Sequence, residues 1–224
     1  MNISILGGGS WGTAMANNLS TQHNILMYIR DDERCNDINI YHENKRYLKG
    51  YKLSENIKAT TDITKALENK IIINAIPTQN IRSMLEKSAE YFNKDSVIVN
   101  LSKGIEKTTG KRISEVFAEF LPENRYAALS GPSHAEEVIE NMPTSIVIAT
   151  QDEDLSQELQ SILTNDCLRI YRNTDLIGVE FGGAVKNVLA LGIGMIDGLG
   201  YGDNPKAAMM TRGIHEMVRF CIEM

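Results

Sequence analysis

The stretch NISILGGGSWGTAMA, residues 2–16, decides the fold of this chain. It starts with a short apolar run that contains β-branched residues, which is typical of a buried strand. Gly7, Gly9 and Gly12 follow at the spacing G-x-G-x-x-G, and a helical segment comes directly after them. In such a unit the first glycine permits a tight turn, the second admits a pyrophosphate and the third allows close packing of the helix. We therefore expect a dinucleotide-binding unit, with phosphates at the helix N-terminus.

Further apolar runs alternate with helical segments, which predicts a doubly wound α/β fold with a mainly parallel sheet. We expect strands over residues 2–6, 24–29, 57–60, 70–76, 96–101, 126–129, 143–149 and 168–171. The ends of five of these strands should point the same way, at Gly7, Arg30, Pro77, Lys103 and Gly131. Open α/β sheets bind their ligands at this edge, so the candidate site lies there.

The end of the second strand bears on the choice of cofactor. An NAD site usually has an acidic residue near this point for the ribose 2′-hydroxyl, but here the residue is Arg30. Arg30, and less strongly Arg34, could face the 2′-phosphate of NADP, yet Asp31 and Asp32 follow at once, so both cofactors stay open. The polar, tyrosine-rich connection over residues 42–53, which includes Tyr47, should lie over the cofactor edge.

Two later turns add polar groups to the same edge. Lys103 stands beside a glycine at a strand end. It is interpreted either as a ligand-binding lysine or as a lysine of a surface loop. The turn Gly131-Pro132-Ser133 offers a backbone N–H and a hydroxyl to the same crevice.

The stretch at residues 175–202 predicts a glycine-rich, apolar helix. One row of this helix at i, i+4 spacing consists of Gly178, Gly182, Lys186, Ala190, Gly194 and Gly198. Glycine destabilises a helix interior by about 0.5–1 kcal/mol relative to alanine, so close packing of a helix or of a ligand should compensate. Asp203-Asn204-Pro205 should cap another helix, with Pro205 at its first position. We expect a dinucleotide-binding domain over 1–173 and the beginning of a helical domain over 174–224.

Composition limits the classes of partner. The chain has 224 residues and a formal net charge of −6, which argues against nucleic acid or an anionic membrane as the main partner. Its three cysteines and four histidines are scattered, so we expect no disulfide framework and no metal site, as suits a cytoplasmic protein. No run approaches a transmembrane span of about 20 apolar residues, so no integral membrane association is expected.

Taken together, the motifs resemble the bacterial-type NAD(P)-dependent glycerol-3-phosphate dehydrogenases over nearly the whole chain. The matching segments are GGGSWGTAMA (7–16), YIR (28–30), AIPTQ (75–79), NLSKGIE (100–106), LSGPSHAEEV (129–138), GVEFGGAVKNVLALGIGMIDGLGYGDNPKAA (178–208) and TRG (211–213). The resemblance implies a Rossmann domain joined to a helical substrate domain. It also implies reduction of dihydroxyacetone phosphate to sn-glycerol 3-phosphate for phospholipid synthesis, with NADP or NAD as cofactor and a homodimer as one candidate assembly.

The resemblance also implies roles for single residues. Lys186 would be the catalytic acid/base, sheltered from water, with Asn187 beside it. Substrate would be held by Lys103, Gly131, Ser133, Lys186 and Asn187. Cofactor would be held by Gly7, Gly9, Ser10, Trp11, Gly12, Arg30, Tyr47, Pro77, Lys103 and Ala135. Within this set Ser10 and Trp11 would contact the phosphates, Arg30 the adenosine ribose and Ala135 the nicotinamide.

The sequence departs from the family pattern in one respect. Family members continue beyond the position of Met224, and that portion carries a catalytic aspartate and a Ser-Arg-Asn segment whose arginine pairs with the substrate phosphate. Arg212 is not that arginine, so we expect this chain to be a catalytically incomplete fragment. Two alternatives stay open: a related dehydrogenase of 3-hydroxy acids, and a nucleotide-binding module without catalysis.

Overall fold

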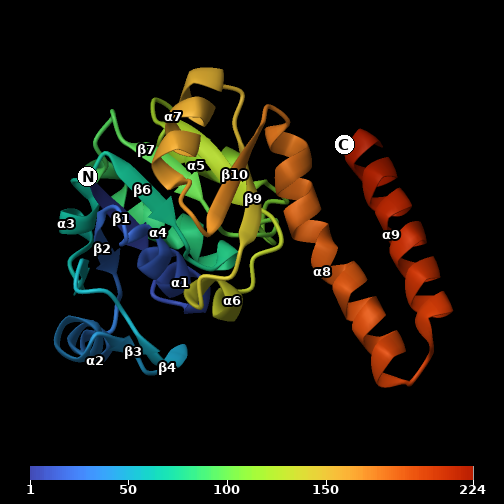
Figure 1. Ribbon diagram of the computed structural model, residues 1–224. Coiled ribbons are helices and arrows are strands. Elements are labelled where there is room, and N and C mark those ends of the chain that lie inside the picture. Colours follow the sequence, from blue (N-terminus) through green and yellow to red (C-terminus); the bar gives the residue numbers. More distant parts are fainter. Residues whose placement is uncertain (224) are drawn as a thin grey trace.

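The computed structural model describes residues 1–223, and an eight-stranded sheet forms their centre (Figure 1). Its strands are β1 (Asn2–Leu6), β2 (Asn24–Tyr28), β5 (Ile57–Thr60), β6 (Ile71–Asn74), β7 (Val97–Asn100), β8 (Arg125–Ser130), β9 (Thr144–Ala149) and β10 (Leu168–Asn173). All eight strands predicted from the sequence are present, within a few residues of the expected ends. Every neighbouring pair is parallel except β8 and β9, so the mainly parallel sheet is confirmed.

The order of the strands places a ligand crevice in the sheet. The order is β10-β9-β8-β7-β6-β1-β2-β5, so the chain winds outward from β1 through β2 to β5 and then crosses to β6 on the other side of β1. The strand order thus reverses between β1 and β6. Ligands of doubly wound sheets bind outside the carboxyl ends of the strands at such a switch point.

Helices cover both faces of the sheet because successive side chains of a strand point to opposite faces. Ile71 and Ile73 of β6 join the core under one set of helices, whereas Ile72 joins the core on the other face. The first core includes residues of α1 (Ser10–Leu19), α2 (Asp32–Asn36), α6 (Ala135–Ile139) and α7 (Glu153–Leu163). The second includes residues of α3 (Ile63–Leu67), α4 (Ile81–Ser88) and α5 (Ile113–Phe120). Short 3-10 turns at Thr78–Asn80 and Ala89–Tyr91 flank α4.

The connection expected over residues 42–53 contains a hairpin that the sequence did not predict. After α2 and a π-helical turn (Asp37–Tyr41), β3 (Glu43–Asn44) pairs antiparallel with β4 (Leu48–Lys52). The fully buried Asn44 fastens the hairpin to the glycine loop, because its Nδ2 donates to the Gly8 carbonyl (3.0 Å) and to Thr13 Oγ1 (2.8 Å). A strand of two polar residues has too little apolar alternation to be recognised.

Two long helices leave the sheet and lie side by side (Figure 1). Asp175 caps α8 (Leu176–Gly198) by accepting from the Gly178 N–H at 2.8 Å. The next helix, α9, spans Asp203–Glu223, so Pro205 is its third residue and the prediction that Pro205 occupies the first position was wrong. Proline is tolerated there because the N–H groups of the first turn have no partner within a helix.

The prediction that a row of glycines packs closely was wrong for most of the row. A Cβ at Gly182, Gly194 or Gly198 would meet no atom of the described residues within 4 Å. The close approach occurs instead at Gly183, where a Cβ would lie 3.0 Å from Ser130 Oγ. The expected i, i+4 row is therefore one residue away from the line along which α8 contacts the sheet.

Helix α8 also corrects the statement that no run approaches a membrane span. Its apolar window has a mean hydropathy of 1.5 and is 17% buried, so by length and composition alone the helix could cross a membrane. A single helix of this kind is weak evidence, since helices of soluble cores pass the same test. Glu180 of α8 is hydrogen-bonded to α5 and β8, so the first turns of α8 are attached to the folded sheet.

Candidate active site

The glycine loop between β1 and α1 has the steric properties that its motif predicts. Gly7 has φ +112°, and a Cβ there would lie 2.8 Å from the Ala75 carbonyl oxygen. A Cβ at Gly12 would lie 2.4 Å from the Gly7 carbonyl oxygen, so the helix packs directly on the turn. Gly7 and Gly12 are therefore required by the fold, whatever ligand the loop holds.

The loop also fits the phosphates of a dinucleotide. Gly9 is the N-cap of α1 and offers no side-chain cap, and a Cβ at Gly9 would meet nothing within 4 Å. The first N–H groups of α1 therefore face open space with the partial positive charge of a helix N-terminus. Nearby, the buried Nε1 of Trp11 has no hydrogen-bond partner among residues 1–223. The first N–H groups of α1 match an anionic ligand, whereas Trp11 packs against the core.

A cleft of about 550 Å³ opens beside this loop. Its wall contains Gly9, Ser10, Arg30, Tyr47 and Pro77, so the structure brings five of the predicted cofactor residues together. Trp11, Lys103 and Ala135 do not line the cleft, and Ala135 is buried where α6 begins. Sequence reasoning missed Lys87 of α4, which lies in the same wall although it is far from the glycine motif in the chain.

The charged side chains in the wall of the cleft are all cationic. They are Arg30, Arg34 and Lys87. Arg34 is engaged, because its Nε lies 3.3 Å from an Asp31 carboxylate oxygen and its guanidinium stacks on Tyr47 with 5.4 Å to the ring centroid. Arg30 and Lys87 are exposed and form no ion pair with another residue of the described chain.

The carboxylate of Asp31, which left the choice of cofactor open in the sequence, caps a helix in the structure. Its Oδ1 accepts from the Arg34 N–H at 3.1 Å as the cap of α2. This backbone hydrogen bond is the main reason that the pKa of Asp31 lies below its ordinary value. Neither Asp31 nor Asp32 lines the cleft, so the charged side chains that line it are cations and include no carboxylate.

A second group of predicted residues meets around Lys103, in the loop after β7. The Lys103 Nζ donates to the Gly131 carbonyl at 3.1 Å, and Ser133 Oγ donates to the same oxygen at 3.2 Å. Burial lowers the pKa of Lys103, and the positive charge of Lys186 lowers it further. The structure therefore brings Lys103, Gly131 and Ser133 together.

The loop that carries Lys103 is held by contacts that the sequence did not reveal. Thr78 Oγ1 donates to the Lys103 carbonyl at 2.8 Å, where Gly104 adopts φ +129°. Further along, the buried Glu106 receives two hydrogen bonds from Arg82, at 2.8 and 2.9 Å. Gln79 donates to the Ile105 carbonyl at 2.9 Å. These contacts tie the loop to the β6–α4 connection, which forms one wall of the cleft.

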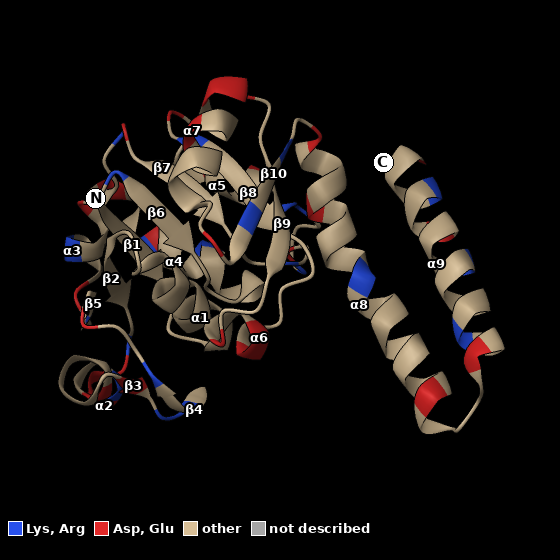
Figure 2. Ribbon diagram, viewed as in Figure 1, with Lys and Arg blue, Asp and Glu red and all other residues tan. Residues whose placement is uncertain are grey.

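Lys186 and Asn187 are both exposed, so the expectation that Lys186 is sheltered from water was wrong for this chain. Gly183 lies against the end of β8, and Lys186 is almost one turn further along α8, where the helix leaves the sheet. Figure 2 shows one basic stretch near the middle of α8 and acidic stretches towards its two ends, and Lys186 is its only Lys or Arg.

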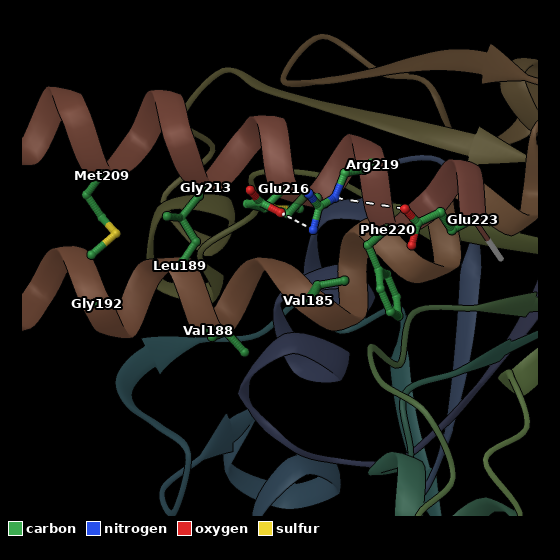
Figure 3. Close-up of a pocket in the computed structure, with 11 residues that line it drawn as sticks. Val185, Val188, Leu189, Gly192, Met209, Gly213, Glu216, Arg219, Phe220 and Glu223 are labelled. Carbon is green, nitrogen blue, oxygen red and sulfur yellow. Dashed lines mark ion pairs between the residues drawn. The ribbon is translucent and has the colours of Figure 1, made fainter.

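An apolar groove between α8 and α9 lies outside this site. It has a volume of about 520 Å³, and Figure 3 shows Val185, Leu189 and Met209 among the side chains that line it, with Arg219 between Glu216 and Glu223 on α9. Phe220, which also lines the groove, makes an edge-to-face contact with Phe181 at 5.7 Å between ring centroids. No residue predicted for cofactor or substrate lines this groove.

Comparisons with known proteins agree with this geometry. The family described as NAD-dependent glycerol-3-phosphate dehydrogenase matches with its N-terminal part over residues 2–156 and with its C-terminal part over residues 175–224. A Macrococcus caseolyticus protein named glycerol-3-phosphate dehydrogenase, NAD(P)+, is 48% identical across 100% of this chain and 69% of its own length. The Halothermothrix orenii protein of the same name is 44% identical across 97% of this chain and 64% of its own length.

Solved structures give the same result. The crystal structure of glycerol-3-phosphate dehydrogenase from Coxiella burnetii has a TM-score of 0.92 and 34% identity, and the match covers 98% of this chain and 68% of that one. The Plasmodium falciparum enzyme has a TM-score of 0.90 and 31% identity, with 98% and 65% covered. This chain therefore spans about two thirds of the length of these relatives, and it belongs to the NAD-dependent glycerol-3-phosphate dehydrogenase family.

Proposed function

We propose that this chain supplies the cofactor site and the proton-transfer lysine of an NAD(P)-dependent glycerol-3-phosphate dehydrogenase. The reaction moves a hydride between NAD(P)H and C2 of dihydroxyacetone phosphate and gives sn-glycerol 3-phosphate for phospholipid synthesis in the cytoplasm. The observation that supports the proposal is the hydrogen bond from Lys103 to the Gly131 carbonyl at the sheet edge that also bears the glycine loop, with α8, the helix of Lys186, packed against Lys103 at Gly183. We assign residues 1–173 to the cofactor domain and 174–224 to the substrate domain.

The cofactor, when bound, supplies the hydride chemistry, and the chain supplies binding, orientation and charge. We assign the open N–H groups that follow Gly9, together with Ser10 and Trp11, to the pyrophosphate. Arg30 and Tyr47 would hold the adenosine end, because both line the cleft next to that loop. Pro77, which lines the cleft, would border the nicotinamide, whereas the cleft does not support the role implied for Ala135, because Ala135 is buried outside it.

The chain must also move one proton for each hydride. In reduction Lys186 would donate a proton to the oxygen on C2, and in oxidation it would remove the proton from the hydroxyl. Such a positioned acid/base typically contributes about 10²–10⁴-fold to the rate. Lys103, Gly131, Ser133 and Asn187 would hold the substrate, and the two lysine charges would attract its phosphate.

The cleft supports NADP over NAD as the preferred cofactor. An arginine at the end of the second strand accommodates a 2′-phosphate, whereas an acidic residue binds a 2′-hydroxyl. Here Arg30 and Lys87 line the cleft without an ion-pair partner in residues 1–223, and the nearby Asp31 is used as a helix cap.

The test compares cofactor binding with turnover. NADPH binding would be titrated by fluorescence, and NADPH-dependent reduction of dihydroxyacetone phosphate would be followed by absorbance. We expect Lys186→Gln to keep the Kd for NADPH and to lose turnover, whereas Lys94→Gln, on the opposite edge of the sheet, keeps both. Where the unchanged protein reduces dihydroxyacetone phosphate, turnover of Lys186→Gln close to that of the unchanged protein would refute the role of Lys186.

A second candidate function is a nucleotide-binding module without catalysis. The exposure of Lys186 favours it, because an acid/base group in open water has little control over proton transfer. Tight NADPH binding with no reduction of dihydroxyacetone phosphate by the unchanged chain would select this function for the chain.

A further inference from the structure

Helix α8 carries a buried carboxylate that the proposed reaction does not use. Glu180 is 8% exposed, although the helix around it is apolar. A buried charge is strongly destabilising unless it is paired and hydrogen-bonded. The contacts of Glu180 therefore show what holds this part of the helix.

Four donors converge on the two oxygens of Glu180. Arg112 donates through a guanidinium nitrogen at 3.1 Å, and Ser114 donates through its N–H at 2.8 Å and its hydroxyl at 2.5 Å. Tyr126 of β8 donates through its hydroxyl at 3.1 Å. Burial and the Glu180 charge raise the pKa of Tyr126 well above its ordinary value, so the hydroxyl keeps its proton. These donors come from the start of α5 and from the sheet, so they fix both the rotation and the axial position of α8.

The next turn of α8 lies against the candidate substrate residues. A Cβ at Gly183 would lie 3.0 Å from Ser130 Oγ and 3.6 Å from Lys103 Cγ. Between Glu180, Gly183 and Lys103 the structure leaves a cavity of only about 10 Å³, at most the volume of one water. Lys186 follows about 9 Å along the helix axis from Glu180. A shift at Glu180 would therefore move Lys186 relative to Lys103.

We propose that Glu180 is a positioning residue, which sets the distance between Lys186 and Lys103 by anchoring α8 to Arg112, Ser114 and Tyr126. The proposal rests on the proposed role of Lys186 in proton transfer. It makes a separate claim, because the distance between two lysines can be measured without turnover.

Three variants separate positioning from general folding. Glu180→Gln keeps the shape of the side chain and removes its charge, and Arg112 retains Glu115 as an ion-pair partner at 3.2 Å. Tyr126→Phe removes one of the four donors and keeps the ring contact with Phe117, at 5.6 Å between centroids. Asp197→Asn is the matched control, because Asp197 is the other acidic residue of α8, is exposed and pairs with Lys206 of α9.

The measurement is a double-mutant cycle on the titration of Lys103, followed by NMR of ¹³C-labelled lysine side chains. With no other substitution, Lys186→Gln should raise the pH at the midpoint of the Lys103 titration, since it removes a neighbouring positive charge. With Glu180→Gln the same change should have less than half this effect, and hydrogen exchange of α8 amides beyond Gly183 should rise about tenfold or more. Tyr126→Phe should reduce the effect of Lys186→Gln on the Lys103 titration by a smaller amount, and Asp197→Asn should not reduce it.

The cofactor site provides the internal standard. Glu180 does not line the cleft, so the Kd for NADPH should stay within about twofold in Glu180→Gln. A full Lys186 effect on Lys103 in Glu180→Gln would overturn the proposal. So would a loss of NADPH binding equal to the loss of coupling, or an equal effect of Asp197→Asn. If dihydroxyacetone phosphate is not reduced, the proposed function fails, but the coupling between the lysines still tests the role of Glu180.

Discussion

Replacing Arg30 by glutamine should change which cofactor the cleft selects. Arg30 lies in the cleft wall with Lys87, and neither cation has an ion-pair partner within residues 1–223. Arg34, the third cation of the wall, is held by Asp31 at 3.3 Å. Arg30 is thus available to a 2′-phosphate, and glutamine keeps much of its length while removing the charge.

The magnitude follows from the contacts that Arg30 can make. A hydrogen bond to a charged group contributes about 1.5–3 kcal/mol, which corresponds to about 10–150-fold in affinity. Arg30 is exposed, so salt screens part of the attraction and the lower half of that range applies. We expect Arg30→Gln to weaken NADPH binding about 10–30-fold. NADH has no 2′-phosphate, so its Kd should change by less than about twofold.

Isothermal titration of NADPH and NADH at two salt concentrations measures this effect. Lys94→Gln is the control, because Lys94 pairs with Glu123 and precedes β7, at the opposite edge of the sheet. The preference for NADPH should fall with added salt in the unchanged protein and depend less on salt in Arg30→Gln. Equal affinity of the unchanged protein for the two cofactors would refute the reasoning, as would a parallel loss of both in Arg30→Gln.

Two other predictions concern the glycine loop and the loop that carries Lys103. Gly12→Ala should lose about 1–3 kcal/mol of stability and lower the Tm, because its Cβ would lie 2.4 Å from the Gly7 carbonyl oxygen. Gly9→Ala has open space, so it should keep the Tm and weaken NADPH binding; equal Tm losses would contradict this. Arg82 lowers the pKa of Glu106 and holds that of Glu119 at about 2, so these carboxylates stabilise the fold above their ordinary pKa of 4.5. Denaturant unfolding should therefore show that Arg82→Gln lowers the free energy of unfolding at neutral pH, and that this difference disappears as the pH falls from 4.5 toward 2. A difference in the free energy of unfolding that is independent of pH would exclude this linkage.

The sheet and the glycine loop could be predicted because their signals are local. Strands such as β6 and β7 are buried on both faces and appear as continuous apolar runs. The glycine motif spans six residues. A side chain at Gly7 or Gly12 would collide with atoms of the same unit or with Ala75, so glycine is required at both positions. The hairpin of β3 and β4 gave no such signal, because its stability depends on Asn44 reaching Gly8 and Thr13.

The supporting residues of the site could not be predicted for a related reason. Arg112 and Tyr126 lie 68 and 54 positions from Glu180, and a single sequence does not show which polar groups meet across such a distance. The isolated Glu180 in an apolar helix was a visible signal, since a buried acid requires partners. The sequence-based prediction centred on the glycine row and Lys186 instead. In the structure, α8 contacts the sheet and α5 through Glu180 and Gly183.

The exposure of Lys186 determines how this site can work. Its helix is fixed to the sheet as far as Gly183, so the backbone that carries Lys186 is set before any ligand arrives, while its side chain stays in water. Removal of that water must then come from the bound cofactor and substrate, or from protein that packs on α8 and α9. Lys103 differs, because the fold already buries it in part and holds its Nζ on the Gly131 carbonyl. In the proposed reaction the two lysines would therefore divide the work: Lys103 would provide a fixed charge in the floor of the site, and Lys186 would act on the substrate only when the site is filled.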